Sequence, residues 1–282
     1  MVYAAGMSVF RTTPINDRDD PRIAPYVSVR EHDLVRRDGL FVAEGDVVVR
    51  VLVASRTYAI QSVLVSESRV AGLGRVIADI DPAVPIYAVE HGLMQAIIGF
   101  PIHRGLMAIG VRGEDSRGDV VLDRLAARAT VVALVGVCNH DNVGGIFRNA
   151  AAFGAGAVLL DATCCDPLYR KALRVSVGGV LHVPFARYDS AHGMLDALVQ
   201  RGFELVALSP QGEHRLETLG PAPRRAIILG AEGPGLPADV MARARRTRID
   251  IASHFDSLNV AVTSGIALHA LANLAGASGA TG

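Results

Sequence analysis

Short runs of apolar residues alternate with segments of helical periodicity along most of the chain. This alternation is typical of α/β proteins, in which strands and helices follow one another. In the first half it predicts a helix over residues 46–54. The strands predicted there cover residues 40–43, 60–65, 86–89 and 105–111, and ordered structure is expected to begin near residues 21–26.

The pattern is stronger in the second half, where the expected strands are apolar at nearly every position. Strands buried on both faces have this character, so we expect a mainly parallel sheet covered by helices on both sides. The predicted strands cover residues 130–137, 157–160, 183–186, 203–208, 226–229 and 247–251. The predicted helices cover residues 144–153, 168–175, 190–201, 237–244 and 260–275.

Two polar segments suggest how the chain is divided. The first 20 residues mix Thr, Pro, Asn and Asp and are predicted to be a flexible arm. The run Arg112–Asp119 has the composition of a linker. We therefore expect an arm over residues 1–20, a smaller α/β domain over 21–111, a linker over 112–123 and a larger α/β domain over 124–282.

Composition excludes several classes of protein. Half of the residues are hydrophobic and a fifth are charged, as in ordinary globular proteins. The apolar run Val131–Cys138 is far shorter than the roughly 20 residues of a membrane-spanning helix. The N-terminus also lacks the basic lead and apolar core of a secretion signal. We expect a cytoplasmic protein without a membrane partner.

Neither the cysteines nor the histidines form a metal-binding pattern. Cys138, Cys164 and Cys165 are odd in number and have no second pair at ligand spacing, so free thiols are expected. The nine histidines are scattered and form no H-E-x-x-H motif. We predict that the protein holds no metal.

Positive charge is carried almost entirely by arginine, since Lys171 is the only lysine. The formal net charge is zero, but arginine suits phosphate contacts, so its distribution matters more than the sum. Each arginine cluster is either an RNA contact or a solvated helix face. The clusters are Arg170, Lys171 and Arg174; Arg224 and Arg225; and Arg243, Arg245, Arg246 and Arg248.

Three loops that follow buried strands carry candidate chemistry, because ligands of open α/β sheets bind at the carboxyl ends of strands. The chain has neither a P-loop nor a G-x-G-x-x-G motif that joins a strand to a helix. The first loop supplies Asn142, with Arg148 further along the next helix. The second supplies Glu232 and the third supplies Ser257 and Asn259. Helix capping is the competing explanation for the polar residues.

In order and spacing, these loops resemble the three motifs of the SpoU (TrmH-type) RNA 2′-O-methyltransferases. The motifs are N-V-G-G-I-F-R-N-A, I-I-L-G-A-E-G-P-G-L-P and I-D-I-A-S-H-F-D-S-L-N-V-A-V-T-S-G-I-A-L. The resemblance covers about residues 125–275. More loosely, Phe41–Gly45, Ser62–Ser66 and His103–Leu106 are similar to the ribosomal-protein-like RNA-binding domain of this family.

The resemblance implies a C-terminal trefoil-knotted parallel-sheet (SPOUT) methyltransferase domain, with a smaller N-terminal α/β domain. It implies S-adenosylmethionine as cofactor, RNA as substrate and a homodimer joined through the knotted domains. The implied catalytic residues are Asn142, Arg148, Glu232, Ser257 and Asn259. The implied cofactor-binding residues are Leu208, Ser209, Pro210, Gly230, Ala231, Gly235, Ile251 and Leu258.

The implied reaction is methyl transfer to a ribose 2′-hydroxyl, which is a poor nucleophile until its proton leaves. Because arginine stays protonated, we expect Arg148 to grip a phosphate and stabilise the developing alkoxide, while the phosphate or a water relays the proton. Ribosomal RNA is favoured over transfer RNA as the substrate. Two alternatives stay open: a non-catalytic RNA-binding or ribosome-assembly factor, and an α/β enzyme that acts on small molecules.

Overall fold

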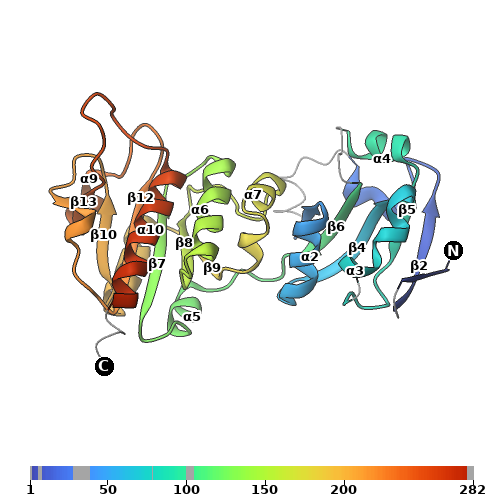
Figure 1. Cartoon of the computed structure of the whole chain (residues 1–282), viewed down its shortest axis with the longest axis horizontal. Helices are drawn as coiled ribbons and strands as arrows, with labels where there is room; N and C mark the ends of the chain where they lie inside the picture. The colour runs from blue at the N-terminus through green and yellow to red at the C-terminus, as the bar shows by residue number, and fades with distance from the viewer. Residues whose placement is uncertain (1, 6–7, 28–38, 78, 100–104, 278–282) are drawn as a thin grey trace. The chain divides into compact units, whose positions relative to one another are not determined.

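The computed structural model of the 282-residue chain describes residues 2–5, 8–27, 39–77, 79–99 and 105–277 (Figure 1). The chain forms two compact units. The N-terminal unit comprises Met1–Glu114 together with Leu168–Leu181, and the C-terminal unit comprises Asp115–Pro167 and His182–Gly282. The chain therefore returns once to the N-terminal unit before the C-terminal unit is complete.

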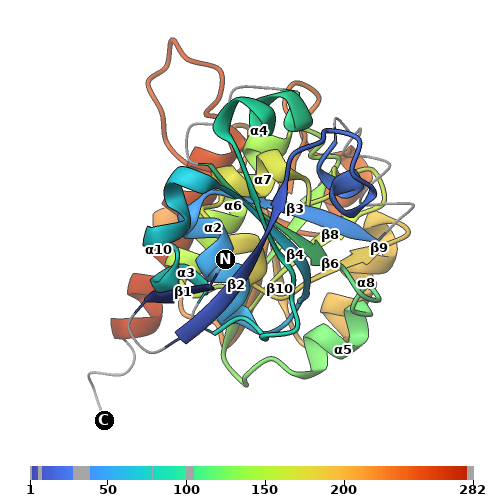
Figure 2. The same ribbon diagram turned by 90° about the vertical axis from the view of Figure 1, so that its right-hand side faces the viewer.

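The N-terminal unit is built on a mixed sheet with the strand order β1-β2-β5-β4-β6-β3. β1 runs antiparallel to β2 (Figure 2), β2 and β4 both run parallel to β5, and β6 is antiparallel to β3 and β4. The strands are β1 (Val2–Ala5), β2 (Ser8–Ile15), β3 (Leu40–Glu44), β4 (Ala59–Ser66), β5 (Ile86–Val89) and β6 (Leu106–Val111).

Short helices complete this unit. Ile23, Tyr26 and Met94 are buried with residues of β4, β5 and β6 in one hydrophobic cluster. A segment from later in the chain also belongs here, and its Arg170 donates to Glu44 of β3 over 2.8 Å. The helices are η1 (Pro21–Tyr26), α2 (Asp46–Ser55), η2 (Glu67–Gly72), α3 (Gly74–Ile77), α4 (His91–Ile98), α7 (Arg170–Val175) and η3 (Gly179–Leu181).

The C-terminal unit contains a seven-stranded sheet with the order β11-β13-β10-β12-β7-β8-β9. Every strand pair in this sheet is parallel, which confirms the fold class predicted from the continuous apolar runs. The strands are β7 (Ala129–Val135), β8 (Ala157–Asp161), β9 (Phe185–Tyr188), β10 (Glu204–Leu208), β11 (His214–Arg215), β12 (Arg224–Gly230) and β13 (Arg245–Arg248).

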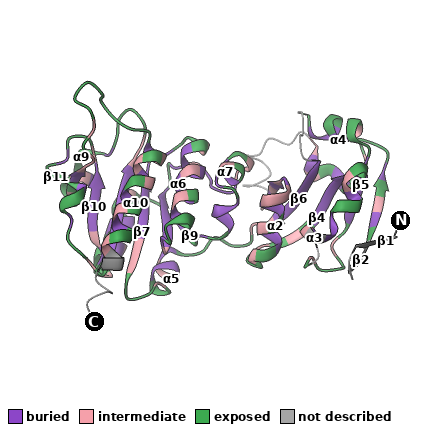
Figure 3. Ribbon diagram, viewed as in Figure 1, coloured by how far each residue is buried: buried purple, intermediate pink, exposed green. Residues whose placement is uncertain are grey.

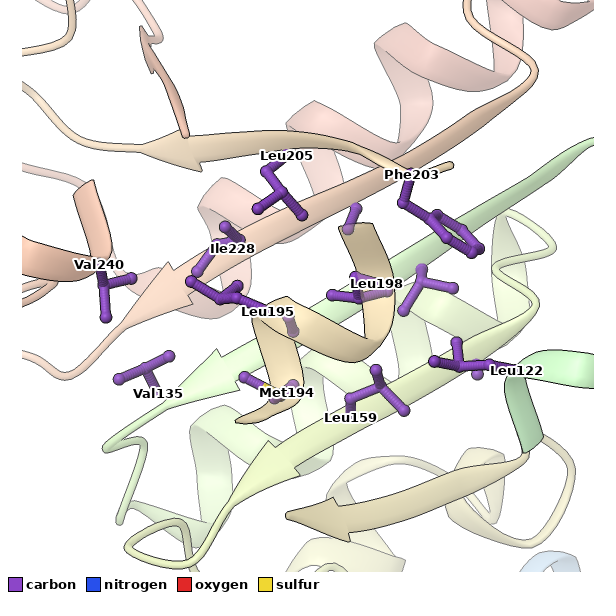
Figure 4. Packing of buried hydrophobic residues seen from close by; sticks show 14 of the residues in the cluster. Leu122, Val135, Leu159, Met194, Leu195, Leu198, Phe203, Leu205, Ile228 and Val240 are labelled. Carbon is purple, nitrogen blue, oxygen red and sulfur yellow. The ribbon is translucent and has the colours of Figure 1, made fainter. Parts of the chain in front are cut away.

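Helices cover both faces of the parallel sheet, so its strands are buried between exposed helix surfaces (Figure 3). On one face, Leu195 and Leu198 lie against Leu159 and Ile228 (Figure 4). Alternate strand residues such as Leu134 point to the opposite face. The helices are α5 (Gly118–Asp123), α8 (Ala191–Gln200) and α9 (Ala238–Ala242) on the first face, α6 (His140–Ala152) and α10 (Val260–Ala277) on the second, and the short η4 (Leu216–Thr218).

The prediction of a flexible arm over residues 1–20 is wrong for residues 8–15. They form β2, which pairs in parallel with β5, and Ile15 is buried. The segment includes Thr12 and Thr13, which are β-branched and fit a strand well. The polar composition of the segment indicates a loop. The strand that pairs with it, β5, lies far along the chain, so no local pattern reveals the pairing.

The predicted linker over residues 112–123 also differs from the structure. Residues Gly118–Asp123 form α5, and Val121 and Leu122 are buried in the core of the C-terminal unit. The charged residues before them suggested a linker, whereas this apolar pair was the local signal of a packed helix. The helix predicted over 168–175 forms as α7 but belongs to the N-terminal unit.

Some sequence features lie outside these elements. His103 and Arg104, part of the N-terminal resemblance, fall outside the described residues. Within the described ranges, no helix is long and apolar enough to span a membrane. The same ranges contain no group of three or more His, Cys, Asp or Glu side chains placed to hold a metal ion. All three cysteines are free thiols.

Candidate active site at the carboxyl ends of the strands

A cavity of about 620 Å³ opens where β10, β12 and β13 end. These strands are neighbours in the sheet, so the loops that follow them meet at one edge. All eight residues expected to bind a cofactor line this cavity: Leu208, Ser209, Pro210, Gly230, Ala231, Gly235, Ile251 and Leu258. Glu232, Ser257 and Asn259 line it too, whereas Asn142 and Arg148 do not.

The loop after β12 folds tightly back on Gly230. Gly235 donates its backbone N–H to the carbonyl oxygen of Ala231 over 3.1 Å. A Cβ atom on Gly230 would lie 2.5 Å from the carbonyl carbon of Gly235 and 2.6 Å from the nitrogen of Leu236. Gly233 and Gly235 both have positive φ, which favours glycine. The cavity wall therefore depends on the absence of a side chain at residue 230.

Asn259 links the third loop to Asn142 of α6 and to Glu232 of the second loop. Its Oδ1 accepts from the backbone N–H groups of Ala261 and Val262, at 2.9 and 3.3 Å, and so caps α10. Its Nδ2 donates to Oδ1 of Asn142 over 2.9 Å and to Oε1 of Glu232 over 3.0 Å. Because the Oδ1 of Asn259 accepts the capping bonds, its Nδ2 must be the donor toward Asn142 and Glu232. Both of these side chains therefore present an acceptor oxygen to Asn259.

Asn142 is placed inside α6 and does not cap it. The cap is Asn139, whose side chain accepts from the N–H of Asp141 over 2.8 Å. The capping explanation for Asn142 is therefore wrong, and α6 begins at His140, four residues before the predicted start at Gly144. Asn142 is 4% exposed, and its Nδ2 has no hydrogen-bond partner among the described residues. A buried donor in this state is expected to serve a ligand or a water.

The loop that leads into α6 is held by Asp161 at the end of β8. Its Oδ1 accepts from the backbone N–H groups of Gly136, Thr163 and Cys164 at 3.0 to 3.2 Å. These bonds fix the turn after β7 and so the start of α6. Burial raises the pKa of Cys165 to about 12 and also raises the pKa of Cys164, so neither thiol is an activated nucleophile.

Arg148 stands apart from the other candidate residues. Its side chain is exposed on α6, and no described residue offers it a hydrogen bond or an ion pair. Within one chain the structure brings together Asn142, Glu232 and Asn259 by hydrogen bonds and places Ser257 in the same cavity wall. No hydrogen bond or ion pair joins Arg148 to them.

Most arginines in the C-terminal clusters are engaged in ion pairs. Arg225 pairs with Glu204, Arg243 with Asp196, Arg246 with Glu213, and Arg248 with Asp250. Arg224 instead donates to backbone carbonyl groups. These arginines therefore serve local structure, in contrast to Arg148, whose guanidinium has no partner within the described ranges.

Several residues of the cavity were not expected from the sequence. Gln211 follows Pro210 in the same turn, so extending the loop by one residue would have included it. Asp256 precedes Ser257 and gave the same kind of local signal. Met241 of α9 and Thr263 of α10 come from helices, and only the tertiary packing places them here.

Comparisons with known proteins identify the family. The model of the SpoU rRNA Methylase family matches residues 129–269. An uncharacterized tRNA/rRNA methyltransferase of Mycobacterium tuberculosis is 37% identical over 263 residues, which cover 90% of this chain and 89% of that protein. The chain belongs to the SpoU rRNA Methylase family. The resemblance of the three loops to SpoU motifs is thereby confirmed.

Solved structures share the fold of this SpoU-family protein. A crystal structure of an RNA 2′-O ribose methyltransferase has a TM-score of 0.77 and 25% identity, and the match covers 93% of this chain and 99% of that one. An AdoMet-bound rRNA methyltransferase from Sinorhizobium meliloti has a TM-score of 0.79 and 21% identity, with coverage of 93% and 98%.

Proposed function

We propose that the protein transfers a methyl group from S-adenosylmethionine to a ribose 2′-hydroxyl of structured RNA. Membership of the SpoU rRNA Methylase family supports RNA methyl transfer. The similarity of the fold to an RNA 2′-O ribose methyltransferase supports the ribose oxygen as the methyl acceptor. The observation that carries the proposal is the array of Asn142, Asn259 and Glu232 at a cavity of cofactor size.

The cavity fits S-adenosylmethionine in size and lining. Its volume of about 620 Å³ lies within the roughly 300–1,000 Å³ of small-molecule sites. Leu208, Ile251 and Leu258 supply apolar walls, and the bare Gly230 lets loop backbone approach closely. When bound, the cofactor supplies a methyl group on positively charged sulfur. The eight residues expected from the sequence would hold it.

The polar array orients the acceptor hydroxyl in this proposal. Asn259 is fixed by its capping bonds and holds the side chains of Asn142 and Glu232 in place. Glu232 and Asn259 line the cavity and are proposed to face the acceptor, whereas the buried Asn142 holds Asn259 in place. Ser257, exposed in the cavity wall, adds a hydroxyl toward the ribose or the phosphate.

Arg148 stabilises charge on the substrate. An arginine side chain has hydrogen-bond donors but no acceptor, so we do not assign Arg148 as the base. Arg148 is exposed and has no partner in the part of the chain that the structure describes, so it can bind the phosphate beside the reacting ribose and stabilise the alkoxide as it forms. The phosphate or a water then carries the proton away. Since no hydrogen bond or ion pair joins Arg148 to the array within one chain, we assign it to the site of a second subunit.

The proposed homodimer uses an apolar strip on α10. Val262 and Ile266 are exposed at 52% and 39%, one helical turn apart. Phe153 at the end of α6 is also exposed and contacts the ring of His269, the next residue along this side of α10. Apolar residues in such a continuous strip are typical of a protein interface. The deep knot implied by the motif resemblance is part of the same proposal.

Substituting the strip tests the homodimer. Val262→Asp is expected to weaken self-association roughly 30-fold, since a buried interface anchor contributes about 2 kcal/mol. Analytical ultracentrifugation measures the change. Val199→Asp is the matched control, because Val199 is equally exposed, at 53%, but lies on α8. A wild-type protein that sediments as a monomer would contradict the assignment.

Ribosomal RNA is the proposed substrate, with transfer RNA as the alternative and the cytoplasm as the location. The N-terminal unit is proposed to bind the RNA, in line with its looser resemblance to ribosomal-protein-like domains. Nucleosides from RNA of cells that lack the protein are expected to lose one 2′-O-methylated species, detected by mass spectrometry. Separate ribosomal and transfer RNA fractions identify the substrate.

A non-catalytic RNA-binding factor predicts a different result. Such a factor leaves the nucleoside profile unchanged and need not bind S-adenosylmethionine. Calorimetric titration of the purified protein with the cofactor separates the two cases. An unchanged profile together with no detectable cofactor binding would reject the proposed function.

A further inference from the structure

Helix α10 is attached to α6 at two points on one face of α6. The first is the hydrogen bond from Asn259 to Asn142 at the start of α10. The second is Asn149, about two helical turns after Asn142, which places both side chains on the same side of α6. Asn149 donates from Nδ2 to the carbonyl oxygen of Ala261 over 2.7 Å and to Oγ of Ser264 over 2.9 Å.

Both acceptors of Asn149 are themselves fixed. Ser264 is fully buried and donates its own hydroxyl to the carbonyl oxygen of Ala261 over 2.7 Å, so its lone pairs face Asn149. Ala261 belongs to the first turn of α10, and its N–H is one of the two groups that Asn259 caps. The side-chain amide of Asn149 therefore binds the first turn of α10, the turn that Asn259 caps.

Helices α6 and α10 cross so closely that α10 has little room to move relative to Asn149. A Cβ atom on Gly145 would lie 2.7 Å from Cβ of Ala261. A Cβ atom on Gly265 would lie 3.1 Å from Nδ2 of Asn149. Small residues on both sides therefore let the helices touch, and Asn149 sets how far α10 can slide or turn on α6.

We propose that Asn149 is a positioning residue for methyl transfer. By fixing the first turn of α10 on α6, it keeps Asn259 within hydrogen-bond distance of both Asn142 and Glu232. It touches neither cofactor nor RNA, and its effect on turnover passes through Asn259. The effect on turnover rests on the proposed function, whereas the effect on the cap of α10 does not.

Asn149→Asp tests the proposal because it keeps the shape and removes both N–H donors. Displacement of catalytic groups by about 1 Å costs roughly 100-fold in rate, so we expect kcat to fall 10-fold to 100-fold. The Kd for S-adenosylmethionine should change less than about twofold, because the residues of the cavity are retained. In an Asn259→Ala background the same substitution should lower kcat by less than about threefold, since coupled residues are not additive.

Hydrogen exchange supplies a readout that does not depend on activity. The amide protons of Ala261 and Val262, which Asn259 caps, should exchange at least about tenfold faster in Asn149→Asp. Leu271→Ala is the control, because it removes a buried side chain of α10 away from the cap and should lower Tm without this local change. Ser264→Ala, which removes one of the two acceptors, gives a milder variant should Asn149→Asp fold poorly.

The outcomes separate the two proposals. Unchanged exchange at Ala261 and Val262 in both Asn149→Asp and Ser264→Ala would overturn the positioning role. Faster exchange together with a wild-type protein that methylates no RNA would support the positioning of the cap and reject the proposed function. Loss of activity in Leu271→Ala equal to that in Asn149→Asp would also overturn the positioning role, since general destabilisation would then explain both.

Discussion

Replacing Arg148 with alanine is expected to lower turnover about 100-fold to 1,000-fold, the usual cost of removing a preorganised group that stabilises transition-state charge. The side chain is exposed and has no partner among the described residues, so the substitution should leave the fold intact. The affinity for S-adenosylmethionine should stay within about twofold, because Arg148 does not line the cavity. Single-turnover kinetics and calorimetry measure the two effects.

Arg124→Ala is the matched control for this variant. Arg124 is another exposed arginine of the C-terminal unit without an ion pair among the described residues, but it lies after α5. It should keep near wild-type turnover. If Arg148→Ala retained more than about a tenth of the wild-type rate, stabilisation of charge by Arg148 would be excluded.

Mixing two impaired variants determines which subunit supplies Arg148. Heterodimers of Arg148→Ala with Asn259→Ala contain one complete site only if the arginine serves the partner's site. An equal mixture should then recover about a quarter of wild-type activity, since half of the dimers are mixed and each has one complete site of two. No recovery would show that Arg148 acts within its own chain.

Gly230→Ala is expected to weaken binding of S-adenosylmethionine at least about 100-fold. The new Cβ atom would lie 2.5 Å from backbone of Gly235, a distance that real contacts essentially never show. Backbone cannot rotate away as a flexible side chain can, so the loop from Ala231 to Leu236 must move into or away from the cavity. Calorimetric titration measures the loss, and circular dichroism checks that the protein remains folded.

Gly220→Ala provides the comparison within the same unit. None of the residues that the structure describes has an atom within 4 Å of a Cβ atom at Gly220, and the φ of Gly220 is not positive. Its cofactor affinity and Tm should therefore match those of the wild type. Undiminished affinity in Gly230→Ala would show that the loop backbone takes no part in cofactor binding.

The sequence predicted the carboxyl-end loops well, because buried parallel strands leave continuous apolar runs. Leu208 and Ile251 are the last residues of predicted strands, Gly230 follows another, and all three line the cavity. Glu232 stands out because it follows a buried strand, and Asn259 stands out because it directly precedes an apolar helix within the third SpoU-like motif. Their hydrogen bond could not be derived from spacing, because it depends on how α10 returns to the ends of earlier strands.

Other features left no local signal. Asn149 resembles any polar residue in a helix, and only the close crossing with α10 reveals its two bonds to Ala261 and Ser264. Asn142 gave an ambiguous signal, because asparagine near a helix start is usually a cap, and the true cap Asn139 lay three residues earlier. The strand over residues 8–15 required a partner far along the chain.

The return of Leu168–Leu181 to the N-terminal unit limits how the protein can be dissected. An expression fragment that stops at Glu114 would leave Glu44 without Arg170 and uncover the surface that α7 and η3 occupy. A fragment that starts at Asp115 would carry Leu173, fully buried in the intact protein, into water. Isolated halves are therefore poor substitutes for the intact chain, and RNA affinity should be apportioned by point substitutions instead.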